Sequence, residues 1–131
     1  MPLKDGSVED YKGAAARHYT DAYTLKSIGQ YDNAGHLIGF AAECAIKHHM
    51  VQVSQSSVNL HLPELLAAAK RQLGSRVGYT SLYDVLKTDA LAGWAIDYRY
   101  APTGKISKET LEGWCAGAKR ILAAAGVRAK S

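Results

Sequence analysis

The sequence predicts an all-α protein, an up-and-down bundle of four to five antiparallel helices that form a single domain over residues 1–131. The chain has the length of one domain and is too short for two domains of ordinary size. A quarter of it is small residues, 21 alanines and 12 glycines, against a single Phe, two Met and three Pro. That composition disfavours a β-sandwich and favours helices that pack closely together.

The first two helices follow from apolar periodicity and from their end signals. The first helix is expected to begin at Ser7, with Asp10 as its capping-box partner, and to end at Gly29. Apolar side chains recur near a 3.6-residue period between these points. Asp32 is then expected to cap a second helix that runs to about Val53.

A polar loop over 54–62 separates this second helix from a third. Pro63 suits the first position of the third helix, and Gly74 is its natural end. Another helical stretch begins at Ser81 and is expected to extend to about Arg99.

A break within 87–93 is compatible with the sequence, so this fourth stretch is either one helix or a short helix followed by a long one. The segment 101–104 (APTG) ends it. Ser107 caps the last helix, which is expected to reach Ala125 and to stop at Gly126.

The second helix is apolar on nearly every side over 37–46 (LIGFAAECAI), so we expect it either in the centre of the bundle or at a subunit interface. Two GxxxG pairs, Gly35 with Gly39 and Gly113 with Gly117, permit close approach of backbones. They predict tight packing inside one subunit or, as the alternative, homodimerisation through one of these faces.

Glu43 is the one carboxylate in that apolar stretch, where an unpaired charge is costly. Lys47 follows at i+4, in the order that favours an ion pair. The two side chains therefore form either an intrahelical pair or the lining of a polar ligand site.

A second group of candidates lies at the predicted end of the fourth stretch, in Asp97, Arg99 and Tyr100. An arginine flanked by tyrosine and a carboxylate can bind phosphate or stack on a base. It can equally form a buried strut with a carboxylate such as Glu43. His61, just before the third helix, is either a loop-packing residue or a further ligand of the same basic pocket.

Several chemistries are not predicted. Cys44 and His48 share a helix face at i, i+4, but no third or fourth ligand follows, so we expect no metal site. No nucleophile elbow and no phosphate-binding GxxxxGK[ST] or GxGxxG motif occurs, so we expect no cofactor. The two cysteines lie far apart, and no apolar run approaches a membrane span, which predicts a reduced cytoplasmic protein. The net charge of +4 is spread along the helices rather than gathered into a stripe for nucleic acid.

Five segments together resemble the HEPN domains (higher eukaryotes and prokaryotes nucleotide-binding). In chain order they are RHYTDA over 17–22, GQYDNA over 29–34, GFAAECAIK over 39–47, HLPELL over 61–66 and WAIDYRY over 94–100. The likeness covers about residues 10–125, and its specificity comes from the order and spacing of these helical motifs. The resemblance implies a four- to five-helix bundle, commonly a homodimer.

Many members of that family are ribonucleases or toxins that act beside a minimal nucleotidyltransferase in toxin–antitoxin or defence systems, and others are non-catalytic. Catalytic members carry an Arg followed after four to six residues by His. No arginine of this chain has a histidine at that distance, which removes the main reason to expect ribonuclease activity.

The sequence thus predicts a non-catalytic HEPN-type domain, dimeric, that binds a nucleotide-like ligand or RNA, or a partner such as a nucleotidyltransferase. The expected ligand site comprises Glu43, Lys47, His61, Asp97, Arg99 and Tyr100. Two alternatives stay open. One is a metal-independent ribonuclease with a displaced active pair, such as Arg99 with His48 or His61. The other is a purely structural interaction subunit.

Overall fold

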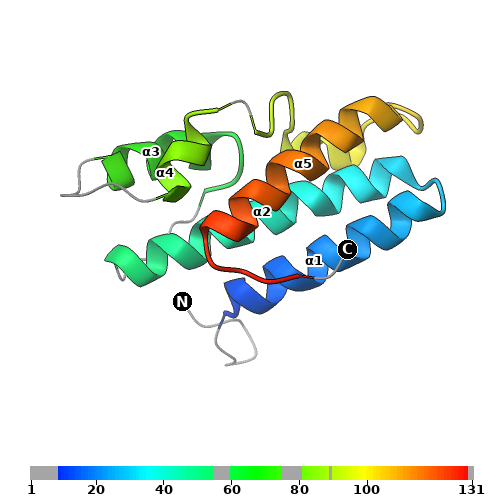
Figure 1. The fold of residues 1–131 in the computed structure, drawn as a ribbon. Helices are drawn as coiled ribbons and strands as arrows, with labels where there is room; N and C mark the ends of the chain where they lie inside the picture. The colour runs from blue at the N-terminus through cyan, green and yellow to red at the C-terminus, as the bar shows by residue number, and fades with distance from the viewer. Residues whose placement is uncertain (1–8, 55–59, 75–80, 89, 130–131) are drawn as a thin grey trace.

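The computed structural model describes residues 9–54, 60–74, 81–88 and 90–129, and this part of the chain is helical with no strand (Figure 1). The elements, in chain order, are α1 (Tyr11–Ser27), α2 (Tyr31–Ser54), α3 (Glu64–Gly74), α4 (Ser81–Leu86), the 3₁₀ helix η1 (Ile96–Tyr100) and α5 (Lys108–Ala124). The prediction of an all-α bundle is confirmed.

Helix α2 is the centre of this arrangement, because it packs against α1, α5, η1 and α3. Figure 1 shows α1 and α2 running antiparallel, with α5 on the other side of α2 and the short pair α3 and α4 grouped beside one end. An apolar character on nearly every side of α2 is what this central position requires.

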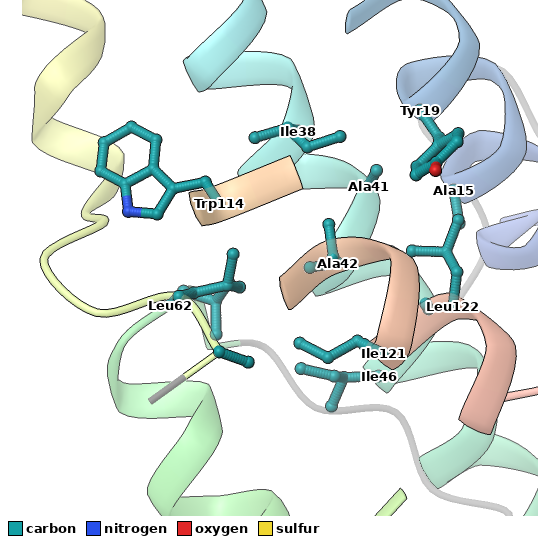
Figure 2. Close-up of a cluster of buried hydrophobic side chains, with 14 of the residues drawn as sticks. Ala15, Tyr19, Ile38, Ala41, Ala42, Ile46, Leu62, Trp114, Ile121 and Leu122 are labelled. Carbon is teal, nitrogen blue, oxygen red and sulfur yellow. The ribbon is translucent and has the colours of Figure 1, made fainter. Parts of the chain in front are cut away.

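The core lies where α1, α2 and α5 meet (Figure 2). Small side chains of α1 and α2 alternate there with large ones, so the backbones approach closely and the rings and branched chains fill the remaining space. The labelled members are Ala15, Tyr19, Ile38, Ala41, Ala42, Ile46, Leu62, Trp114, Ile121 and Leu122, all buried.

The ends of α1 differ in part from the prediction. The helix begins at Tyr11 rather than at Ser7, which lies outside the described residues. Asp10 is its N-cap, because its carboxylate accepts a hydrogen bond from the Gly13 N–H at 2.9 Å. The predicted stop at Gly29 is confirmed, with φ at 81°, a conformation that suits glycine.

The sequence predicted Asp32 as the cap of α2, and this prediction is wrong. The helix begins one residue earlier, at Tyr31, and the Asp32 carboxylate instead accepts hydrogen bonds from the loop before α5, from the Gly104 N–H at 2.8 Å and the Ile106 N–H at 3.1 Å. A local capping pattern cannot predict hydrogen bonds to residues so far away in the sequence.

Helix α3 begins immediately after Pro63, with Glu64 as its first residue, and it ends at Gly74 as predicted. The Leu62–Pro63 peptide bond is cis. Of the predicted polar loop over 54–62, residues 55–59 lie outside the described part of the chain.

The predicted break within 87–93 is confirmed, because the short helix α4 ends at Leu86. A single continuous helix is therefore wrong, and so is a long second helix, because the second part is the five-residue η1. Gly93 adopts φ of 83°, which is incompatible with a continuing α-helix, and the Trp94 indole N–H donates to the Gly35 carbonyl at 2.8 Å. This hydrogen bond holds the segment against α2.

Helix α5 follows the prediction to within one residue. The Ser107 hydroxyl accepts from the Thr110 N–H at 3.1 Å as an N-cap, the helix ends at Ala124, and Gly126 has φ of 79°.

Atoms of the same chain occupy the space beside three of the four GxxxG glycines. A methyl group on Gly39 would overlap the Trp94 indole, and one on Gly35 would press on the Trp114 ring at 3.0 Å. A methyl group on Gly117 would overlap the Ala90 carbonyl, whereas Gly113 faces open space. Three of the four glycines are therefore explained by packing inside one subunit.

Candidate functional site

Glu43 is the centre of a buried hydrogen-bond network between α2 and the segment before α3. Its side chain is 4% exposed. One carboxylate oxygen, Oε1, accepts the Leu62 backbone N–H at 3.1 Å, and the other, Oε2, lies 2.9 Å from the His61 Nδ1. The Lys47 ammonium lies 3.3 Å from the same Oε2. This single side chain therefore fixes the position at which the chain enters α3.

The network continues from Lys47 to the beginning of α1. Lys47 is 8% exposed, and its ammonium lies 5.9 Å from the centre of the Tyr11 ring. The Tyr11 hydroxyl donates to the Glu9 carboxylate at 2.7 Å. Burial, reinforced by Glu9, raises the pKa of Tyr11 to about 12, so this hydroxyl keeps its proton at neutral pH. Each charged side chain of the network thus has an ionic, hydrogen-bonding or aromatic partner.

Asp97, Arg99 and Tyr100 lie elsewhere, on the exposed side of η1. The Arg99 guanidinium is stacked on the neighbouring Tyr100 ring, 4.8 Å from its centre, and Tyr100 is 80% exposed. Within the described residues neither Asp97 nor Arg99 forms an ion pair, so both charges face solvent. The group presents one cation, one anion and one ring on a single short element.

Packing beneath η1 holds this group in place. The Tyr98 ring stacks on Trp114 of α5 with centres 5.9 Å apart, and Trp94 packs edge-on against Phe40 of α2 at 6.0 Å. A 3₁₀ helix of five residues would not be stable alone. Here two aromatic contacts and the Trp94 hydrogen bond to α2 fix its orientation.

The charge of Arg99 acts on the imidazole of His36 on α2. Burial, and secondly the positive charge of Arg99, lower the pKa of His36. The His36 Nδ1 is buried and has no hydrogen-bond partner among the described residues. The ring meets Phe40 edge-on at 4.7 Å, and His18 of α1 lies on Phe40 as well, at 6.0 Å. Burial and Arg17 lower the pKa of His18.

The six predicted ligand residues thus fall into two groups, and no hydrogen bond or ion pair between described residues joins them. Glu43, Lys47 and His61 form one cluster, in which the predicted i, i+4 pair is present. Asp97, Arg99 and Tyr100 form the other. The predicted strut between Arg99 and Glu43 is not formed, because Arg99 is solvent-exposed while the Glu43 oxygens are occupied.

The remaining titratable candidates show no activated nucleophile. Burial raises the pKa of Cys44 to about 11, so its thiol stays protonated. Burial also raises the pKa of Cys115 and lowers the pKa of His48. Across the described residues no group of three or more His, Cys, Asp or Glu side chains is placed to hold a metal ion.

Two features of the site were not found from the sequence. His36 shares a face of α2 with Phe40, four residues on, and that spacing alone could have linked them. The effect of the Arg99 charge on the pKa of His36, 63 positions away in sequence, has no local signal.

Comparison with protein-family models, with curated proteins and with solved structures gives no match to this chain. Among the helices in the described ranges, none combines the length and apolar character needed to cross a bilayer.

Proposed function

We propose that this chain is a non-catalytic HEPN-type helical domain that binds a nucleotide-like ligand through η1 and acts beside a partner such as a minimal nucleotidyltransferase, in a toxin–antitoxin or defence context. The observation that carries the proposal is the solvent-exposed Arg99–Tyr100 pair on a firmly packed 3₁₀ helix. The order of the five HEPN-like motifs supports the family, and the all-α bundle is the fold that the resemblance implies.

The exposed face of η1 has the groups that a nucleotide needs. A guanidinium binds phosphate oxygens through two parallel N–H donors, and Arg99 has no carboxylate competing for them within the described structure. Tyr100 presents an accessible ring on which a base can stack. Asp97, also exposed, can accept hydrogen bonds from ligand hydroxyl or amino groups.

The buried cluster has a different role in this proposal. Three donor groups already surround the Glu43 carboxylate, and Lys47 is almost fully buried. We assign to them the positioning of the segment before α3. His61 is the member of this cluster that a ligand can reach, because its side chain remains 53% exposed.

A metal-independent ribonuclease remains the second candidate, and one observation favours it. The predicted displaced pairs were Arg99 with His48 or His61, but the imidazole whose pKa Arg99 lowers is His36, with its buried Nδ1 unpartnered among the described residues. Arg99 with His36 is therefore the pair to test. Intact tRNA and mRNA after incubation with a large excess of pure protein would exclude this candidate. Cleavage that His36→Asn abolishes would replace the non-catalytic proposal.

Isothermal titration calorimetry with a nucleotide panel tests the ligand proposal. We expect Arg99→Ala and Tyr100→Ala to weaken binding about tenfold, the loss of roughly one charge-assisted contact or one stacked base. Arg120→Ala is the matched control, since it removes an exposed arginine from α5. Circular dichroism should show all three variants folded, because none of these side chains is buried. Wild-type protein that binds no nucleotide would contradict the ligand proposal.

The dimeric state and the cytoplasmic location are part of the same proposal. The resemblance implies a homodimer, and Gly113, with open space beside it, is the GxxxG glycine that packing inside the subunit does not explain. Both cysteines are free, as in a reducing compartment. Sedimentation equilibrium that gives a monomer of 14.1 kDa at all concentrations would contradict the dimer.

A further inference from the structure

A hollow of about 620 Å³ lies between α1 and the segment that follows α5. Its lining residues are Ala16, Arg17, Thr20, Asp21, Arg128 and Ala129. Figure 1 shows the segment after α5 leaving the end of that helix and running back along α1. No residue of η1 lines this hollow, so it is separate from the exposed face of η1.

The wall formed by the segment after α5 is held by defined contacts. Gly126, with φ of 79°, turns the chain, and the Val127 N–H donates to the Leu122 carbonyl at 2.9 Å. Val127 is 5% exposed and belongs to the core. The backbone therefore carries Arg128 to a fixed position opposite α1, as a preformed site requires.

The charge around the hollow is mainly positive. Arg17 and Arg128 line it from opposite walls, and neither forms an ion pair within the described part of the chain. A smaller hollow of about 350 Å³ adjoins it, shares Arg128 and Ala129, and adds Lys119. Asp21 is the carboxylate in the lining of the larger hollow, so cations outnumber anions over the two.

We propose that the larger hollow, named here the Arg17–Arg128 groove, binds the phosphate monoester of a small organic ligand. Two guanidinium groups on facing walls suit the several oxygens of one phosphate, which each of them can engage through paired donors. The methyl groups of Ala16 and Ala129 and the stems of the arginines supply an apolar floor for the organic part. Asp21 adds an acceptor for a ligand hydroxyl or amino group, and the volume lies in the range of small-molecule sites.

The test is a titration of the ¹⁵N-labelled protein, followed by two-dimensional NMR, with four ligands: AMP, ribose 5-phosphate, adenosine and single-stranded oligoadenylate. We expect both phosphate esters to shift the amide signals of Thr20 and Arg128, and adenosine to leave them unchanged. Arg17→Ala and Arg128→Ala should each lower the apparent affinity measured from these shifts at least tenfold. Both side chains are exposed, so the variants should stay folded by circular dichroism.

Two control variants separate this site from the other surfaces. Arg120→Ala removes an exposed arginine outside the groove and should leave the Thr20 and Arg128 shifts intact. Arg99→Ala should also leave them intact, even if it abolishes binding at η1, so the two proposals can fail independently.

Three outcomes would overturn the proposal. The first is that no phosphate ester shifts the groove signals of the wild-type protein. The second is that adenosine shifts them as much as AMP does, because phosphate would then contribute nothing. The third is that only single-stranded oligoadenylate shifts them, because the phosphate would then come from a nucleic-acid backbone and not from a small ligand.

Discussion

Replacing Glu43 with alanine is the substitution that most directly probes how α2 holds the segment before α3. The Glu43 carboxylate accepts the Leu62 N–H at 3.1 Å, contacts His61 at 2.9 Å and neutralises the Lys47 ammonium at 3.3 Å. All of these interactions disappear together in Glu43→Ala. Both Leu62 and Lys47 are left buried.

The expected cost follows from those two buried groups. A buried N–H without an acceptor costs about 1–3 kcal/mol. Removing one partner of a buried ion pair costs about 3–5 kcal/mol when the remaining charge is fully enclosed. Lys47 keeps 8% exposure and the Tyr11 ring, and the desolvation of Glu43 itself is relieved. We therefore expect a total somewhat below the sum of the two lower bounds, about 3 kcal/mol, or a fall in Tm on the order of 10 °C for a domain of this length.

Urea unfolding followed by circular dichroism at 222 nm measures this loss. Glu43→Gln should be intermediate, because it keeps an acceptor for the Leu62 N–H while it removes the charge beside Lys47. Glu112→Ala, which removes an exposed carboxylate from α5, should change the free energy of unfolding by less than about 0.5 kcal/mol. Equal stability of Glu43→Ala and Glu112→Ala would mean that the Glu43 network contributes nothing to folding, contrary to this expectation.

Two further predictions concern packing and pH. Gly39→Ala should destabilise the protein by about 1–3 kcal/mol or more, because its methyl group would overlap the Trp94 indole, whereas Gly113→Ala meets open space and should be neutral or slightly stabilising; equal unfolding midpoints in urea would contradict this. Stability should also fall as the pH drops below the ordinary histidine pKa of 6.5, because a lowered folded-state pKa means that the unfolded chain binds protons first. Urea midpoints at pH 7.5 and 5.5 measure this, and a midpoint that rises on acidification would contradict the lowered pKa values of His18, His36, His48 and His49, each caused mainly by burial.

The sequence predicted those parts of the fold that local signals determine. Periodicity and the Ser107 cap located α5 to within one residue, and Gly29 and Gly74 ended their helices as expected. It failed at η1, where an apparently helical stretch is held as a short 3₁₀ turn by the Trp94 hydrogen bond to α2. Asp32 failed for a related reason, since its carboxylate binds N–H groups more than 70 positions away.

The candidate site was predictable to the same extent. The Glu43–Lys47 pair follows from i, i+4 spacing within one helix. The separation of this pair from Arg99 does not follow from any local spacing. It depends on the position of η1 on α2, which aromatic packing between distant segments determines. The approach of Arg128 to Arg17 was equally inaccessible, since the chain turns back along α1 only after Gly126.

We propose that the exposed face of η1 binds a nucleotide-like ligand through Arg99 and Tyr100. Two-dimensional ¹H–¹⁵N NMR of the wild-type protein and of Arg99→Ala, titrated with the same nucleotide panel, tests it most directly. We expect saturable shifts at residues 96–100 and at His36 in the wild-type protein, and at least tenfold weaker binding at these signals in Arg99→Ala. Unchanged signals over 96–100 with every nucleotide, or shifts that Arg99→Ala leaves intact, would contradict the claim.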